Sequence, residues 1–258
     1  MKKINFAKAL QALAYRFVWP RNHECILCNH ALYRYLPYRK GSAHAPPLMR
    51  VLGIIGSNPD QFECPWCGSN DRDRHLFLYM MALGFLPDMC GKTVLHFAPE
   101  RRLSPCILAA GPEQYVKCDL FPQSSDVMRV DMLDMPFYDG SFDLLIANHV
   151  MEHVADDRQA LAEICRVLKS GGFAILQTPY SSKLHHTWQD PGINTDEARL
   201  NAYGQEDHVR LYGQDIFERF EASGLRSCVI LHKDALPNIN GAEYGVNEAE
   251  PFFLFQRP

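Results

Sequence analysis

The sequence predicts an α/β protein with a mostly parallel, doubly wound sheet that follows a small N-terminal module. From residue 90 onward, short apolar runs alternate with amphipathic runs, which is the pattern of repeated βαβ units. Ahead of them, four of the nine cysteines fall into two close pairs, which indicates a separate cysteine-bound unit. The 258 residues are enough for one large domain and one small one.

Residues 1–20 predict an amphipathic helix. Phe6, Leu10, Leu13 and Phe17 recur at helical spacing, and Pro20 ends the pattern. We expect this apolar stripe to dock on the rest of the protein, although a basic amphipathic helix can also lie on a membrane surface. Charged and polar residues interrupt the stretch, and the chain has no run of about 18 apolar residues. We therefore expect neither a signal peptide nor a membrane span.

Charge is distributed unevenly along the chain. Residues 1–50 carry nine lysines and arginines against one acid, whereas the remainder carries 17 basic and 29 acidic residues. Such a basic head contacts an anionic partner, such as RNA or a membrane surface, or is simply a solvated face. Both interpretations remain open from the sequence.

Residues 21–72 contain the predicted metal-binding module. Cys25 and Cys28 form one CxxC pair, and Cys64 and Cys67 form a second pair after 35 intervening residues. Two such pairs complete a tetrahedral site that favours zinc, and four protein ligands leave no open position, so we expect one structural zinc ion. The other five cysteines are scattered, which indicates a reducing, cytoplasmic setting. Alternative ligands beside the first pair are His23 and His30.

Residues 73–258 form the predicted main domain. It opens with a helix at 73–88, and further helices are expected after Glu100, from Asn148, and at 214–223. The sequence Lys-Ser-Gly-Gly at residues 169–172 predicts a turn. The predicted strands are 92–97, 115–119, 127–131, 144–147 and 173–177, with an apolar closing pair at 228–232 and 252–255.

Two of these strands end in an acid. Asp119 closes the second strand about 20 residues after the first, where a carboxylate can accept both hydroxyls of a ribose. Asp131 closes the third strand in the same way. Because the carboxyl ends of parallel strands meet at one edge of the sheet, both acids are candidate ligand-binding residues. Either could instead cap a helix or form a turn.

Several short motifs follow one another between Asp131 and Gln177. They are Asp131, Met135-Pro-Phe137, Asp139-Gly-Ser-Phe-Asp143, His149-Val-Met-Glu-His-Val154 and Arg166-Val-Leu-Lys-Ser-Gly-Gly172. In this order, which is more specific than any one motif, the stretch resembles the type 11 branch of the class I methyltransferases. The resemblance implies a Rossmann-like, seven-stranded sheet that binds S-adenosylmethionine across its carboxyl edge and transfers a methyl group.

The resemblance also implies residue roles. Asp119 would hold the ribose hydroxyls, Asp131 would meet the adenine ring, and Asn148 with His149 would lie near the methyl group. The first motif, His96-Phe-Ala-Pro-Glu100, lacks the family's glycines, and a Cys-Pro-x-Cys-Gly module ahead of such a motif resembles a variant subfamily. Ala98 is small enough to replace a glycine in part, and Glu100 can contact the cofactor's amino group. The expected cofactor-binding set is His96, Phe97, Ala98, Glu100, Asp119, Leu120, Asp131, Met132, Asn148 and His149.

Residues 178–213 predict a polar lid at the same edge of the sheet. Methyl transfer needs an aligned nucleophile and, for a nucleophile of high pKa, a base. The candidate bases are His149, His153 and His208, and we expect the first two to share one helical face. The expected substrate-binding residues are Tyr180, His185, His186, His208, Arg210 and Tyr212, of which Arg210 would suit an anionic acceptor.

Three functions remain compatible with the sequence. We favour a methyltransferase that acts on an O or N nucleophile of a small molecule, such as a sugar, a glycan precursor or another metabolite. The first alternative is an RNA methyltransferase whose zinc module and basic head contact phosphates. The second alternative is a non-catalytic binding module that kept the fold, suggested by the missing glycines.

Overall fold

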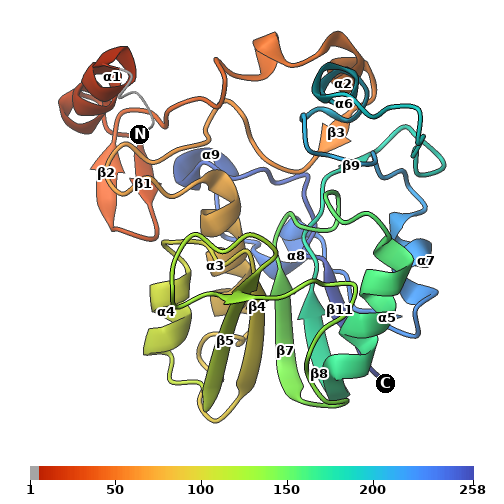
Figure 1. Ribbon diagram of the computed structural model, residues 1–258. Coiled ribbons are helices and arrows are strands. Elements are labelled where there is room, and N and C mark those ends of the chain that lie inside the picture. Colours follow the sequence, from red (N-terminus) through yellow and green to blue (C-terminus); the bar gives the residue numbers. More distant parts are fainter. Residues whose placement is uncertain (1–5) are drawn as a thin grey trace.

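The computed structural model describes residues 6–258 and contains one seven-stranded sheet (Figure 1). Its strand order is β10-β11-β8-β7-β4-β5-β6. The five strands from β8 to β6 run parallel, whereas β11 is antiparallel to both β8 and β10. The doubly wound sheet predicted from the sequence is therefore confirmed. The strands are β4 (Thr93–Phe97), β5 (Gln114–Asp119), β6 (Met128–Arg129), β7 (Phe142–Ala147), β8 (Leu168–Ile175), β10 (Arg226–Ser227) and β11 (Leu254–Gln256).

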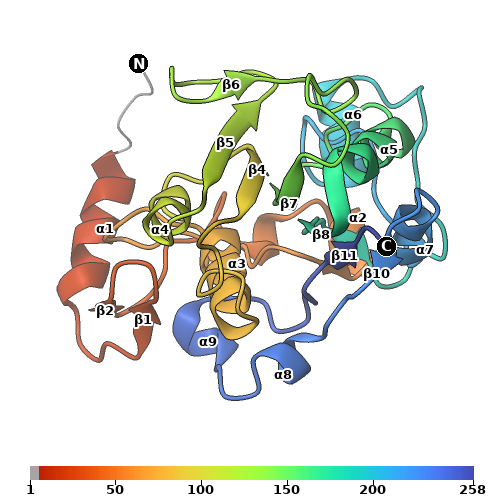
Figure 2. The same ribbon diagram turned by 90° about the horizontal axis from the view of Figure 1, so that it is seen from below.

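Helices cover both faces of this sheet. Successive strand residues point to opposite faces, so the apolar strands present side chains to both layers of helices. Leu95 and Leu145 pack into one core cluster together with α5 and α7, whereas Val94 and Leu144 pack into a second cluster with α3 and α4. Figures 1 and 2 show the two helical layers from the front and from below. The helices are α3 (Asp71–Ala82), α4 (Ser104–Ala109), α5 (Asp157–Val167), α7 (Ile216–Glu221) and α8 (His232–Ala235).

The N-terminal module lies against the rest of the chain through contacts with three short elements that come after β8. Its strand β3 pairs antiparallel with β9 of the predicted lid, α2 contacts α6, and β1 contacts α9. The module consists of α1 (Phe6–Phe17), β1 (His23–Cys25), β2 (His30–Leu32), the 3-10 helix η1 (Ser42–His44), α2 (Pro47–Val51) and β3 (Ile54–Ile55). The elements that meet it are β9 (Tyr180–Ser181), α6 (Asp196–Tyr203) and α9 (Gly241–Tyr244).

The apolar stripe of α1 is half exposed rather than docked along its length, contrary to the expectation. Leu10, Leu13 and Phe17 expose 52%, 50% and 59% of their surfaces. The Phe17 ring meets the Trp66 ring edge to face at 5.5 Å, and the other side of the helix adds contacts, because Arg16 donates to the carbonyl of Pro65 and α1 contacts β2. Predicted residues 1–5 of this helix lie outside the described part of the chain.

The helix expected from Asn148 begins only at Asp157, so the prediction that His149 and His153 share a helical face was also wrong. His149 adopts a left-handed backbone with φ 56°, which cannot belong to a right-handed helix. The helix begins where Asp156 caps it, with its carboxylate accepting from the amides of Arg158 and Gln159.

Strand β8 also begins earlier than predicted. Residues 169–172, predicted as a turn, belong to β8 and pass through a register shift opposite Phe142 and Leu144. Gly172 permits this irregularity, because a Cβ there would lie 2.9–3.2 Å from three backbone carbonyl oxygens. Within residues 6–258, no helix has the length and apolar character needed to cross a membrane.

Candidate cofactor edge, metal centre and substrate cavity

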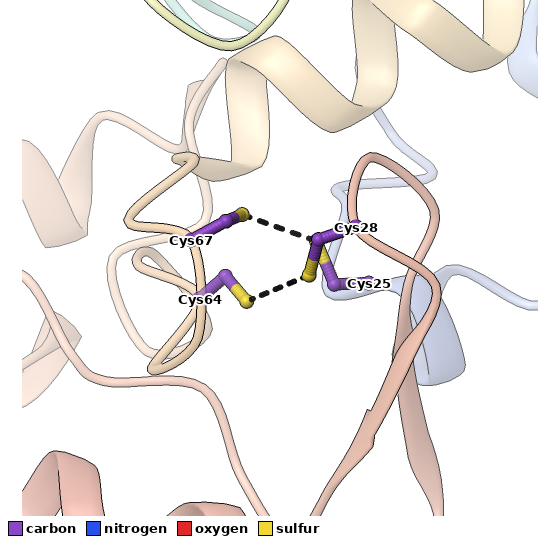
Figure 3. A group of neighbouring side chains, drawn as sticks. All are labelled: Cys25, Cys28, Cys64 and Cys67. Carbon is purple, nitrogen blue, oxygen red and sulfur yellow. Dashed lines mark hydrogen bonds between the residues drawn. The ribbon is translucent and has the colours of Figure 1, made fainter.

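The four cysteines of the predicted zinc module converge on one point (Figure 3). The Sγ atoms of Cys25 and Cys67 lie 3.7 Å apart, and those of Cys28 and Cys64 lie 3.9 Å apart. A tetrahedral zinc ion with bonds of about 2.3 Å separates its sulfur ligands by about 3.8 Å. Burial and the neighbouring sulfurs raise the pKa of the Cys28 thiol to about 12, so a thiolate here needs a nearby cation. The donor set thus fits a structural zinc ion.

The second cysteine pair is tied directly to the sheet domain. Nε of Arg102 donates to the carbonyl of Cys67 at 2.6 Å, from the segment that follows the first strand of the sheet. The hydroxyl of Ser69 lies 3.2 Å from the sulfur of Cys67. The hydrogen bond from Arg102 therefore joins the cysteine site to the loop that follows β4.

The predicted cofactor residues follow the carboxyl ends of neighbouring parallel strands. Ala98 follows β4, Asp119 ends β5, Asp131 comes two residues after β6, and Asn148 follows β7. The strand order reverses between β4 and β7, and ligands of open α/β sheets bind at such a switch point. One carboxylate oxygen of Asp119 accepts from the amide of Phe121 at 2.8 Å, so its own loop orients the side chain.

The first motif builds a buried polar pair beside Asn148. Nε2 of His96 lies 2.9 Å from Oε2 of Glu100, and Nδ1 of His96 lies 2.8 Å from the hydroxyl of Tyr115. The amide of Asn148 donates to Oε1 of Glu100 at 2.6 Å. Burial opposes ionisation of Glu100, but the His96 imidazole and the Asn148 amide hold its pKa below the usual value.

The amide oxygen of Asn148 is buried and has no hydrogen-bond partner among residues 6–258. With the Glu100 carboxylate beside it, this oxygen offers an acceptor pair suited to a ligand ammonium group. Ala98 approaches the same edge with a left-handed backbone of φ 48°, the conformation that glycine would adopt without strain. This edge therefore fits S-adenosylmethionine despite the missing glycines.

The other cofactor candidates occupy different surroundings. Phe97 and Met132 are buried in the core cluster that contains α5, and Leu120 is exposed. The His96 ring is fully buried, so it reaches a ligand only through Glu100. The carboxylate of Asp131 is on the surface and accepts from the amide of Leu133.

His149 lies between two buried carboxylates. Its Nδ1 is 3.4 Å from Oε1 of Glu152, and its Nε2 is 3.3 Å from Oε1 of Glu250. Burial and Arg72 lower the pKa of His149, but these two carboxylates prevail and raise it above the usual value. The raised pKa favours the protonated ring, and a protonated imidazole has no lone pair with which to act as a base.

The network continues behind Glu250. Its Oε2 lies 3.2 Å from Nδ1 of His75, and Nε2 of His75 lies 2.9 Å from Nδ1 of His232. The sequence prediction missed Glu250, His75 and His232. Their separations of 175 and 157 residues along the chain left no local pattern to signal the contact.

The two remaining candidate bases pack against each other. The rings of His153 and His208 lie 4.7 Å apart in an edge-to-face arrangement. Nδ1 of His208 lies 3.0 Å from the carbonyl oxygen of Tyr203, so this nitrogen carries the proton and Nε2 holds the lone pair. Burial lowers the pKa of His208, which keeps the ring neutral near pH 7.

A cavity of about 830 Å³ lies between the N-terminal module and the predicted lid and is lined by residues of both. Its lining includes Arg39, Arg50 and Arg72, and neither Asp nor Glu lines it in the described part of the chain. His149 and His208 also line it, so the cavity reaches the residue next to Asn148. Sequence reasoning missed the three arginines because Arg39 and Arg50 lie in the N-terminal module and Arg72 lies on α3, all outside the predicted lid.

The predicted substrate residues divide between the cavity and the core. His208 and Arg210 line the cavity, whereas the surfaces of His185 and His186 are exposed. The Arg210 guanidinium donates to the carbonyls of Met151, Val154 and Ala155, so it is already fully bonded. Tyr212 is fully buried and donates to Asp157, and Tyr180 packs on the core that includes Phe253.

Comparison with known proteins matches residues 103–176 to a family described as a methyltransferase domain. The uncharacterised methyltransferase YcgJ of Bacillus subtilis is 29% identical over 126 residues, which cover 46% of this chain and 47% of that protein. Ajmaline N-methyltransferase of Rauvolfia serpentina is 44% identical over 46 residues, which cover 18% of this chain and 16% of that protein. The chain thus spans less than half the length of these curated relatives.

A solved structure with a similar fold is a chain from the complex between the Haloferax volcanii Trm112 methyltransferase activator and a candidate methyltransferase. It is 19% identical, with 72% of this chain and 92% of that chain covered and a TM-score of 0.47. The fold assignment rests on the strand order and on the antiparallel β11.

Proposed function

We propose that the methyltransferase domain of this chain, which has the class I fold, binds S-adenosylmethionine and transfers its methyl group to an O or N nucleophile of a small molecule. One observation carries this proposal. Asp119, Asp131 and Asn148 lie at or just after the carboxyl ends of β5, β6 and β7, beside the switch point between β4 and β7, and the buried amide oxygen of Asn148 lacks a hydrogen-bond partner among residues 6–258. Bound S-adenosylmethionine would supply an electrophilic methyl group.

Each residue of the edge has a proposed role. Asp119 accepts hydrogen bonds from the ribose hydroxyls, and Asp131 lies nearest the adenine ring. Glu100 and Asn148 receive the ammonium group of the methionine moiety, with His96 holding Glu100 in place. The four-cysteine cluster holds one structural zinc ion, and nine free cysteines support a reducing, cytoplasmic setting.

The cavity supports a small anionic acceptor. A volume of about 830 Å³ lies within the range of small-molecule sites. Arg39 in the lining is paired with Glu206, but Arg50 and Arg72 also line the cavity and neither Asp nor Glu does in the described part of the chain, which favours carboxylate or phosphate groups. In the transfer, the nucleophile bonds to the methyl carbon as the carbon–sulfur bond breaks, and S-adenosylhomocysteine leaves. His208 lines this space, but its buried Nε2 lies 3.9 Å from Oε1 of Glu152, so the proton of the acceptor has no base assigned from the cavity wall.

The first experiment is calorimetric titration with S-adenosylhomocysteine. The native chain should bind in the micromolar range, and Asp119→Ala should weaken binding at least about tenfold, because it removes charge-assisted hydrogen bonds to the ribose. Asp134→Ala is the matched control, since Asp134 is an exposed acid near the same edge. No binding by the native chain would contradict the enzyme proposal and favour a non-catalytic module.

A second experiment separates a small acceptor from RNA. Retention of the native chain on RNA should be negligible at physiological salt if the acceptor is small. Strong retention that falls steeply with rising salt would instead favour phosphate contacts by the basic N-terminal region.

A further inference from the structure

Glu152, His153 and His208, here named the His2Glu cluster, bring three metal-ligand side chains together beside the cavity. Nε2 of His153 lies 4.0 Å from Oε1 of Glu152, and Nε2 of His208 lies 3.9 Å from the same oxygen. All three ligand atoms lie within 4.8 Å of one another. We propose that the His2Glu cluster binds a divalent transition-metal ion, most readily Zn²⁺, separate from the ion of the four cysteines.

Unpaired buried atoms provide the first argument. Both carboxylate oxygens of Glu152 and Nε2 of His208 lack a hydrogen-bond partner across residues 6–258, and the contact of Oε1 with Nδ1 of His149 is an ion pair at 3.4 Å. Glu152 exposes 1% of its surface and His208 exposes 4%. The separations of 3.9 and 4.0 Å exceed the hydrogen-bond range of about 2.7–3.2 Å, so these groups do not satisfy one another directly. A bound cation would satisfy all of them at once.

The orientation of the rings provides the second argument. Nδ1 of His208 donates to the carbonyl of Tyr203, and Nδ1 of His153 lies 3.3 Å from both the carbonyl and Oδ2 of Asp207. Each ring therefore presents the lone pair of Nε2 toward Glu152. Ligating histidines of known metal sites are held in the same way, by an acceptor on the other ring nitrogen.

The spacing and the donor types select the ion. Bonds of about 2.1 Å in a tetrahedral site separate ligand atoms by about 3.4 Å. A contraction of about half an ångström brings Oε1 of Glu152 to that distance from each Nε2, and the two Nε2 atoms start within 4.8 Å of each other. His153 lies on a turn with 31% of its side chain exposed, so it has room to move. Two imidazoles with one carboxylate suit zinc and its neighbours, whereas calcium and magnesium prefer all-oxygen sites.

His149 holds the carboxylate of this cluster without being a ligand. Its Nδ1 lies 3.4 Å from Oε1 of Glu152, and its Nε2 is directed at Glu250. Three protein ligands leave a fourth position open, and His208 lines the cavity. Water or an oxygen atom of a cavity ligand can take that position. The site is argued from its own geometry and does not depend on methyl transfer.

Metal titration of the full chain tests the proposal. The chain is stripped with a chelator and titrated with Co²⁺ under reducing conditions, and bound metal is counted at equilibrium. The native chain should bind one equivalent more than Glu152→Gln and one more than His153→Asn. The exposed His186→Asn variant should bind as much metal as the native chain.

The cobalt spectrum assigns the extra equivalent. Co²⁺ at the four cysteines gives a sulfur-to-metal charge-transfer band, whereas Co²⁺ at the His2Glu cluster gives visible bands without it. Equal metal binding by the native chain and a folded Glu152→Gln variant would overturn the proposal. The partly exposed His153→Asn variant serves the same comparison if Glu152→Gln does not fold. Titration with S-adenosylhomocysteine, expected to be unchanged in both, keeps this test separate from the cofactor proposal.

Discussion

At the scale of single residues, the cofactor edge combines backbone strain with buried charge. Ala98 and His149 both have left-handed backbones. Ala98 directly follows β4, and His149 comes two residues after the end of β7. Such strain persists only where the surrounding structure fixes it, and it concentrates at functional sites. For His149, the buried contacts with Glu152 and Glu250 hold the left-handed backbone in place.

Ala98→Gly tests the strain at the first motif. An L-residue in the left-handed region costs about 1 kcal/mol or more, and glycine avoids that cost. We expect the substitution to raise the free energy of unfolding by about 0.5–1 kcal/mol in urea denaturation. The control Ala110→Gly has φ −73°, so it should instead lower stability by a similar amount. Equal losses in both variants would contradict the strain argument.

The sequence identified residues with a local signal better than those brought together by folding. The acid at the end of a strand placed Asp119 correctly, because sheet geometry fixes where that residue lies. The network of His149 with Glu250 and His75 left no such signal, since it joins three distant segments. The position of Arg210 in the predicted lid indicated a substrate contact, but its guanidinium donates hydrogen bonds to three backbone carbonyls instead.

At the scale of elements, the pairing of β3 with β9 connects the module to the segment that leaves the sheet after β8. Gly56 lies at this junction, with φ 153°. A Cβ there would lie 3.0 Å from Cβ of Pro179 and 3.6 Å from Cε1 of His149. The close approach of the module to the segment at Pro179 therefore favours glycine.

Gly56→Ala should lower the free energy of unfolding by about 1–3 kcal/mol, because overpacking adds to backbone strain. Gly111→Ala is the matched control, since Gly111 also has a positive φ but has nothing within 4 Å of the added Cβ. It should lose only the smaller, conformational part. Equal losses in thermal and urea unfolding would show that the contact with Pro179 is unimportant.

Strands were predicted more accurately than the segments between them. The central strands β4 and β5 lie within one residue of the expected ranges. The buried apolar run of β4 gives a strong signal, whereas β5 is only partly buried and was recognised by its β-branched and aromatic residues and the acid that ends it. The helix start near Asn148 was misplaced because apolar spacing does not reveal a left-handed residue. Helix α6 was missed because its sequence is polar and only a few of its residues are buried.

At the scale of the whole molecule, one arginine links the cysteine module to the C-terminal segment. The fully buried guanidinium of Arg74 on α3 donates to the carbonyls of Gln61, Phe62 and Ser69 on the module side. It also donates to the carbonyls of residues 244 and 245 near α9, and it lies 3.9 Å from the ring centre of Tyr35. These bonds predict that the module and the sheet domain unfold together.

Arg74→Lys tests this coupling. Lysine keeps the charge but cannot reach five carbonyls in two directions, so several buried acceptors lose their donors. We expect the free energy of unfolding to fall by about 3–5 kcal/mol, with a single transition retained in urea. The control Arg72→Lys alters a partly exposed arginine on the same helix and should cost less than about 1 kcal/mol. Two separate transitions in the native chain, one following the cysteine site and one the sheet, would mean that the module folds independently of Arg74.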